Sequence, residues 1–410
     1  MNLKLFLEKT SEYIFAFTMF FAFAGLYASS KGHSYLSILV VTSISLGIIN
    51  RIFNKEREPH SNGTTNKLTI IFLIYGATLV INRLLHGEDS SIIRISIFLA
   101  VFAYLVPMTV IVRRLSIYGV ITSGFIFGIL TFNSLSNGIE RVGGYTNEIL
   151  FAQGCLVLTI LNAYIFSDKD NSLFIRCGAS VGGLGSLYGL LFSQSRGAWL
   201  SIIVVVFLCA MLNYKKIFSI INKKILAVGF LVSVTLALLV ITIVPSDNIL
   251  IKRVDAVAGD YQQMKVGNYQ TSIGLRFVVW KSAWLGFIEN PIFGVGKNGL
   301  NDLKKEQVTL GKVNPVLLVG DGGYGMPHAH NQYLNHLVLR GAVGFISLML
   351  LLSTPCFMSE KGKYIGVLIT AAYIVSGFTD VPLDQKEPYY LFLFSLLFCI
   401  IYSDCIKKAS

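Results

Sequence analysis

Charged side chains are scarce in this sequence: they make up 14% of its 410 residues, whereas hydrophobic residues make up 54%. This composition excludes an ordinary soluble domain. Apolar segments of about 20 residues, each long enough to cross a hydrocarbon core of roughly 30 Å, recur along most of the chain. A transmembrane β-barrel would instead show short strands of alternating hydrophobicity, which the sequence lacks. The sequence therefore predicts an all-α polytopic membrane protein.

Cysteines and acidic residues are also few. The six cysteines include no CxxC pair, so we expect them to serve as small apolar residues in or near the spans, with neither disulfides nor a metal site. The 22 acidic residues are outnumbered by 34 lysines and arginines, which gives a net charge of +12. The basic residues collect in short loops between apolar segments, as is typical of cytoplasmic loops. We therefore expect contact with membrane lipid and no binding of nucleic acid.

The apolar segments predict about twelve transmembrane helices, at approximately residues 12–29, 34–50, 68–85, 92–111, 115–133, 148–166, 172–192, 198–213, 225–244, 332–354, 364–380 and 388–404. If these helices alternate in direction, the basic clusters all fall on one side of the membrane. Positively charged loops stay in the cytoplasm, so both termini are expected there.

Three parts follow from this pattern. Residues 1–244 hold the first nine helices, residues 245–331 form a large segment on the non-cytoplasmic side, and residues 332–410 hold the last three helices and a cytoplasmic tail. The middle part is too long to be a passive connector.

The large segment contains a predicted helix at residues 271–290, "TSIGLRFVVWKSAWLGFIEN". Ser272 is expected to cap it, and Asn290-Pro291 to end it. Its broad apolar surface suits a helix that lies on the bilayer surface or against the spans. Arg276 lies in this helix. Its permanently charged, planar guanidinium suits a diphosphate, although a solvated surface position is the alternative.

A second arginine, Arg196, lies in the tight turn "SQSRGAW" between two predicted spans on the same side. It is either an interfacial anchor, since arginines commonly extend to the membrane surface, or a ligand for an anion. Asp380 follows the eleventh span on that side. Its carboxylate is placed to orient a histidine or pair with an arginine, or it is an ordinary residue at a helix end.

The stretch "HAHN" precedes the tenth span. Free histidine accepts a proton near neutral pH, so His330 is a candidate base, with capping or packing as the alternative. Pro327 is placed to start the helix. His328 is then expected to point away from His330.

Recognised metal and nucleotide motifs are missing from the sequence. His328 and His330 have no HExxH partner and no carboxylate pair nearby in the chain, so we expect no metal. Neither a P-loop nor a GxSxG elbow is present, which argues against a soluble nucleotide as substrate. We expect no cofactor.

Three stretches carry a resemblance to a known family. They are "SRGAW", the run "GLRFVVWKSAWLGFIENPIFGVGKNGL" at residues 274–300, and His330-Asn331 followed after nine residues by Gly341 and after two more by Gly344. The second resembles a G-x-R-x3-W…N-P-x-x-G-x-G pattern, and the third a His-Asn, nine residues, Gly-x-x-Gly pattern. Together they resemble the bacterial O-antigen ligases, whose superfamily includes the O-antigen polymerases, over nearly the whole chain.

One position departs from that family, which often has an acidic residue where this chain has Arg340. An unpaired charge inside a membrane costs roughly 2.5–3.5 kcal/mol or more. Arg340 is therefore expected to find a carboxylate, a carbonyl group or a watery cavity.

The resemblance implies a fold and a reaction. Such ligases resemble the integral-membrane C class of glycosyltransferases (GT-C), with a helical periplasmic loop domain, and they lie in the inner membrane of Gram-negative bacteria. At its periplasmic face they move O-antigen glycan from undecaprenyl diphosphate to a terminal sugar of lipid A–core, without metal or ATP. Direct displacement would invert the anomeric centre.

The resemblance also assigns site residues. His330 is implied as the general base, and Arg196 and Arg276 as catalytic residues that bind the diphosphate. Asn331, Asp380 and His328 are the further substrate-binding candidates, because they lie on the same side in the sequence-based topology.

Other functions remain open at this stage. An O-antigen polymerase would use the same donor but extend glycan on the carrier lipid, and a related ligase would attach glycan to protein. A polytopic lipid or glycan transporter predicts charges near the membrane midplane and two similar halves. Arg340 fits the first of these features, but we find no repeated halves.

Overall fold

The computed structural model describes residues 3–54, 63–87, 90–214, 258–319 and 325–404, and within these ranges the regular structure is helical. Eleven of the predicted spans coincide with helices: α1 (Leu3–Ala24), α2 (Gly32–Phe53), α3 (Gly63–His86), α4 (Ser91–Leu105), α5 (Val110–Ser136), α6 (Glu148–Ser167), α7 (Leu173–Phe192), α8 (Arg196–Leu212), α14 (Gln332–Leu352), α15 (Glu360–Gly377) and α16 (Lys386–Asp404). The ninth predicted span, 225–244, lies outside the described residues.

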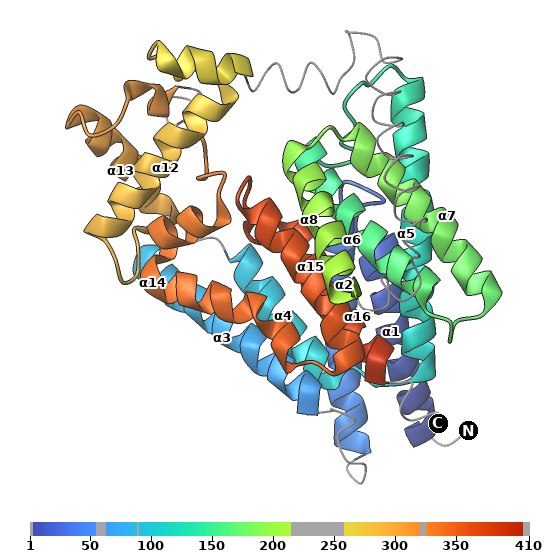
Figure 1. Cartoon of the computed structure of the whole chain (residues 1–410). Coiled ribbons are helices and arrows are strands. Elements are labelled where there is room, and N and C mark those ends of the chain that lie inside the picture. The colour runs from blue at the N-terminus through green and yellow to red at the C-terminus, as the bar shows by residue number, and fades with distance from the viewer. Residues whose placement is uncertain (1–2, 55–62, 88–89, 215–257, 320–324, 405–410) are drawn as a thin grey trace.

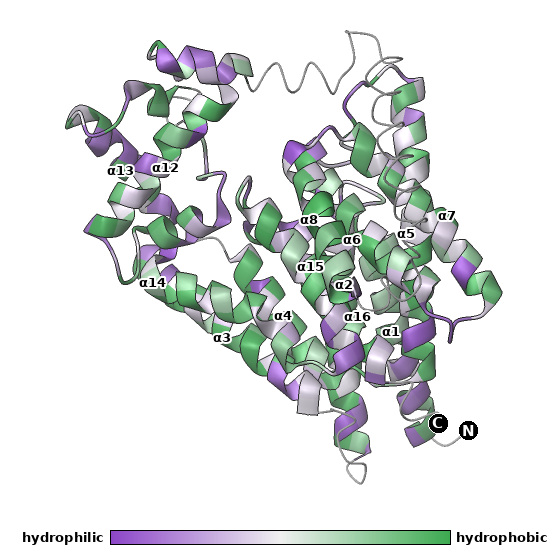
Figure 2. Cartoon of the chain, viewed as in Figure 1, coloured by the Kyte–Doolittle hydropathy of each residue, from purple (hydrophilic) through white to green (hydrophobic). Residues whose placement is uncertain are grey.

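The described helices make the protein a multi-pass membrane protein. Six of them, α2, α3, α5, α6, α7 and α14, are long and apolar enough to cross a bilayer, and α4 and α8 are shorter apolar helices. Hydrophobic residues cover these helices in Figure 2, and large apolar side chains such as Leu184 and Phe207 are exposed on their outer surface. An apolar outer surface of this kind is stable only against lipid.

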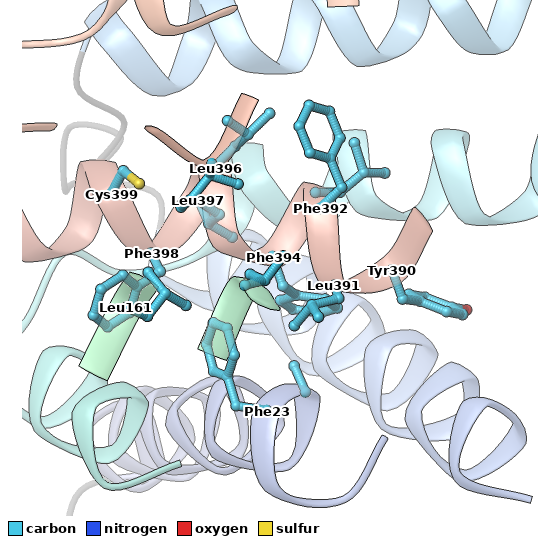
Figure 3. Close-up of a cluster of buried hydrophobic side chains, with 14 of the residues drawn as sticks. Phe23, Leu161, Tyr390, Leu391, Phe392, Phe394, Leu396, Leu397, Phe398 and Cys399 are labelled. Carbon is cyan, nitrogen blue, oxygen red and sulfur yellow. The ribbon is translucent and has the colours of Figure 1, made fainter. Parts of the chain in front are cut away.

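Helix α16 forms the centre of the bundle (Figure 3). Its residues from Pro388 to Asp404 are all buried, as expected for a helix that is apolar on every side. Phe398 packs edge-on against Phe23 of α1 at a centroid distance of 5.7 Å. The described cysteines are free: Cys155 and Cys399 are buried, Cys209 is half-buried, and Cys177 and Cys356 are exposed.

A smaller helical unit lies at one end of the bundle, beside α14 (Figure 1). It comprises α12 (Ser272–Glu289), α13 (Gly296–Thr309) and the 3-10 helix η1 (Pro315–Leu318), which share a separate apolar core. The predicted helix is confirmed and ends before Asn290, but its cap is wrong. The hydroxyl of Thr271, and not Ser272, accepts the backbone N–H of Gly274 at 3.0 Å.

Helix α14 is broken at Gly341, whose φ of 62° is left-handed. The break frees backbone groups to bond with the segment between α12 and α13. The N–H of Ala342 donates to Pro291 O at 2.8 Å, and the N–H of Val295 donates to Val338 O at 2.8 Å. The two glycine-containing stretches recognised in the sequence therefore hydrogen-bond directly to each other, and we call this contact the joint.

Close backbone approach explains the glycines of this joint. A Cβ on Gly294 would collide with the backbone of Leu339, and one on Gly341 with the backbone of Ile292. Asn82 of α3 closes the joint, because its Nδ2 donates to Phe293 O at 2.9 Å and to Leu339 O at 3.1 Å. The smaller unit is thus held against the bundle by hydrogen bonds as well as by apolar packing.

Several loops meet at this end of the bundle, which we call the α12 end. Four contacts join them: Gly296 with His86, Gln194 Nε2 with Glu140 O at 2.7 Å, Gly197 with Thr379, and His33 Nδ1 with Glu387 Oε1 at 2.9 Å. The loops that carry the candidate site residues therefore share one end, as the alternating topology predicts.

Candidate functional site

The backbone before His330 is held from two sides. Trp280 of α12 donates its Nε1–H to Ala329 O at 2.9 Å, and the N–H of Ala329 donates to Asn335 Oδ1 at 3.1 Å. His330 itself has a φ of +46°, which is uncommon for a residue other than glycine. Backbone strain of this kind persists only where the surroundings enforce it, and it is common at functional sites. The backbone that carries His330 is thus firmly positioned.

Helix α14 begins at Gln332, as the predicted span does, but the role expected for Pro327 is wrong. Pro327 does not start it; Asn331 is its N-cap, and its Oδ1 accepts the N–H groups of Tyr333 at 3.0 Å and Leu334 at 3.1 Å. Asn331 therefore has only its amide NH2 left for a substrate.

His328 and His330 pack together, which corrects the expectation that they diverge. Their ring centroids are 4.2 Å apart, and the N–H of His330 donates to His328 Nδ1 at 3.3 Å. The helical geometry assumed for the prediction does not apply, because both residues precede α14. Burial lowers the pKa of His328 to about 4, and the neighbouring imidazole of His330 adds to this effect. His328 is therefore neutral at pH 7, with its proton on Nε2.

Asp380 faces His330. Its Oδ1 lies 3.4 Å from His330 Nδ1, with the two side chains 7% and 20% exposed. Burial by itself would raise the pKa of Asp380, but the contact with His330 and the proximity of both imidazoles outweigh it, so the pKa is lowered. An ionised carboxylate at Nδ1 keeps the proton of a neutral imidazole there and leaves Nε2 as the acceptor.

Arg276 belongs to the same cluster. It lies four residues before Trp280, so the two side chains share one face of α12. Burial lowers the pKa of Arg276, Asp380 opposes this shift, and Arg196 reinforces it. Arg196 and Asp380 therefore both lie close enough to Arg276 for their charges to act on it.

Arg196 is the first residue of α8 and adjoins the loop that carries Asp380. Gly197 packs so closely on Thr379 that a Cβ there would collide with Thr379 Oγ1. Within the described residues, neither Arg196 nor Arg276 makes a side-chain hydrogen bond or an ion pair. Two neighbouring cations that make no ion pair in the described part of the chain form a natural site for a multivalent anion.

Arg340 has found the carboxylate that the sequence analysis required. Its Nη1 donates to Asp384 Oδ1 at 2.8 Å and lies 3.1 Å from Nε2 of the buried His336. Asp384 Oδ2 accepts from Gln332 Nε2 at 3.0 Å and from Asn335 Nδ2 at 2.8 Å. Burial would raise the pKa of Asp384, but Arg340 and these hydrogen bonds hold it below its usual range.

Asn335 connects this ion pair to the candidate base. Its Nδ2 donates to Asp384, while its Oδ1 accepts the N–H of Ala329, the residue before His330. Sequence reasoning missed Asp384 and Asn335. The only available signal was the requirement of Arg340 for a carboxylate, which did not specify which acidic residue would supply it.

An alternative role for the cluster of His328, His330 and Asp380 is to bind a metal ion. The potential ligand atoms of His328, His330 and Asp380 all lie within 4.8 Å of one another. Two imidazoles and a carboxylate are a ligand set that zinc accepts, with a position left open. The prediction of no metal considered only sequence neighbours, whereas the fold brings Asp380 to the histidines. The donor types therefore fit an ion, and a chelator can test whether one takes part.

The structure thus defines a multi-pass membrane protein with a polar, partly buried site at one end of its bundle. Residues 181–349 match the family described as "O-Antigen ligase", so this part of the chain is similar to that family. The matched range includes Arg196, Arg276 and His330.

A relative in Haemophilus influenzae is similar over almost the full length. It is described as "Uncharacterized protein", and it is 27% identical over 393 residues, which cover 90% of this chain and 93% of the relative.

Proposed function

We propose that the protein is an O-antigen ligase that moves glycan from undecaprenyl diphosphate to a terminal sugar of lipid A–core. The observation that carries this proposal is the convergence of two arginines, Arg196 and Arg276, on the pair formed by His330 and Asp380. Catalysis by such a site needs an anionic leaving group on one side and a hydroxyl nucleophile on the other.

The arginines bind the donor. The bond between sugar and diphosphate is already activated, so the reaction needs no nucleotide. Negative charge grows on the diphosphate as this bond breaks, and two preplaced guanidinium groups stabilise it. Neither side chain makes a hydrogen bond or an ion pair in the described part of the chain, which leaves their N–H donors for phosphate oxygens.

His330 activates the acceptor. Its Nε2 takes the proton of the sugar hydroxyl while the hydroxyl oxygen attacks the anomeric carbon of the donor. The bond from that carbon to the phosphate oxygen breaks, and its electron pair leaves with the diphosphate, so the anomeric configuration is inverted. Asp380 orients the imidazole and stabilises the imidazolium. General base catalysis of this kind contributes about 10²–10⁴-fold.

The membrane arrangement supports a lipid-linked donor. Phe277, Trp284 and Ile288 form an outward stripe on α12 and are 49%, 49% and 56% exposed. We propose that this stripe lies in the outer leaflet of the inner membrane, which sets Arg276 at the level of lipid phosphates. The proposal takes the α12 end as periplasmic, the termini as cytoplasmic and residues 225–244 as the ninth of twelve spans in a GT-C-like arrangement. The helical segment 245–331 is then a periplasmic part between 1–244 and 332–410.

The test uses purified full-length protein in detergent with undecaprenyl-diphosphate-linked glycan and lipid A–core. Wild type is expected to produce a ladder of glycosylated lipid A–core, and His330→Ala to produce none. His33→Ala is the matched control, because His33 lies at the same end of the bundle but pairs with Glu387. Longer glycan on the carrier lipid would instead identify a polymerase. The absence of both products would favour a transporter.

A further inference from the structure

A cavity of about 260 Å³ lies beside the histidine pair, among α3, α4, the start of α13 and α14. Its polar lining comprises Ser91, His328, Asn335, Arg340, Asp384, Lys297 and Gln385. Arg196 and Arg276 belong to other helices, α8 and α12, and are not part of it. The molecule therefore has a partly open cavity of mixed polar and apolar lining next to the candidate base.

His328 connects this cavity to the base. It lines the cavity, and its ring packs edge-on against that of His330. Because His328 Nδ1 accepts the backbone N–H of His330, the neutral ring carries its proton on Nε2 and can donate it to a hydroxyl oxygen. A molecule bound in the cavity would thus contact His328, whose ring packs against His330, the group that removes the proton.

The lining suits a sugar. Asp384 and Asn335 line the cavity but already bond to each other and to Arg340 and Ala329, whereas Leu79 and Ile92 supply apolar surface for the C–H faces of a ring. In the described part of the chain, the side chains of Lys297 and Gln385 make no hydrogen bond or ion pair, so both remain available to a ligand. The volume is slightly below the roughly 300–1,000 Å³ of pockets for drug-sized ligands, which fits one sugar ring better than an oligosaccharide.

We propose that this cavity binds the terminal sugar of the acceptor, the one whose hydroxyl is glycosylated. The inference rests on the proposed function, because only a transferase needs an acceptor site beside the donor site. Displacement with inversion also requires the nucleophile to approach opposite the leaving group. The cavity is lined by residues of α3, α4 and α13 and not by the arginines of α8 and α12, so different helices would bind the acceptor and the diphosphate.

The test distinguishes an effect on acceptor binding from an effect on donor binding. Transfer kinetics are measured with full-length wild type, Lys297→Ala and Gln385→Ala, varying lipid A–core and the undecaprenyl-diphosphate-linked donor in turn. Each substitution is expected to raise the KM for the acceptor about tenfold, as loss of one hydrogen bond does, and to leave the KM for the donor unchanged. Lys305→Ala is the control, because this lysine lies on the same helix outside the cavity.

A second arm offers a lipid-linked glycan as acceptor. If wild type glycosylates only this lipid, the proposed function fails, and a raised KM for that acceptor in the cavity variants still supports a sugar site. If wild type glycosylates either acceptor but both variants keep the wild-type KM for it, the cavity is not the acceptor site. If wild type transfers to neither, both proposals are overturned.

Discussion

Asp380 Oδ1 lies 3.4 Å from Nδ1 of His330, a contact between the loop after α15 and the segment before α14. The carboxylate is almost buried, yet the two histidines lower its pKa, so it faces the imidazole as an anion. An anion held against one imidazole nitrogen makes the opposite nitrogen the proton acceptor. This contact therefore makes Nε2 the nitrogen of His330 that accepts the proton in the proposed reaction.

Asp380→Asn should lower kcat for glycan transfer by about 10²–10⁴-fold, because the amide neither selects the tautomer nor stabilises the imidazolium. The KM for the donor should change little. Glu387→Gln is the control, since Glu387 lies near the same loop but pairs with His33. Equal activity of Asp380→Asn and wild type would remove Asp380 from the mechanism.

The buried ion pair between Arg340 and Asp384 makes a prediction about stability. Arg340→Met should destabilise the protein by roughly 3–5 kcal/mol, because it leaves a buried carboxylate without its cation. The double variant with Arg340→Met and Asp384→Leu should recover part of this loss. Unfolding in detergent measures both, and a single variant as stable as wild type would contradict the assigned pairing.

Stability should depend on pH through His328. Its pKa is about 4 in the folded protein and 6.5 in the unfolded chain, so the unfolded chain binds more protons between these values. Stability is therefore lost as the pH falls below 6.5, by about 2 kcal/mol at pH 5 from this residue. His328→Asn should lose less stability than wild type between pH 7.5 and 5 in thermal unfolding. Parallel losses in the two proteins would show that His328 is not held neutral.

Chelation distinguishes a base from a metal site at the histidines. If His330 acts as a base, EDTA should leave the rate of transfer unchanged, and added zinc should inhibit by occupying His328, His330 and Asp380. Loss of activity with EDTA, together with recovery on adding a divalent ion, would assign the cluster to a metal.

The sequence predicted the helices well and the site only in part. Apolar runs locate spans because a membrane demands about 20 apolar residues, and motif spacing pointed to Arg196, Arg276 and His330. The conformation of "HAHN" was not predictable in this way. Asn331 caps α14 and leaves both histidines outside it, which brings His328 against His330.

Contacts between residues far apart in the sequence could not be predicted either. Asp384 pairs with Arg340 only because the loop before α16 folds over α14, and no local pattern encodes that contact. The hydrogen bond from Trp280 to Ala329 is a second example, since it depends on how α12 docks.

The most direct test of the account is a double-mutant cycle on the binding of undecaprenyl diphosphate, using Arg196→Ala, Arg276→Ala and the double variant. If both arginines hold one diphosphate, the loss of affinity in the double variant should differ from the sum of the single losses by roughly 0.5–3 kcal/mol. Strictly additive losses, or unchanged affinity in either single variant, would show that the two arginines do not share the ligand and would contradict the proposed site.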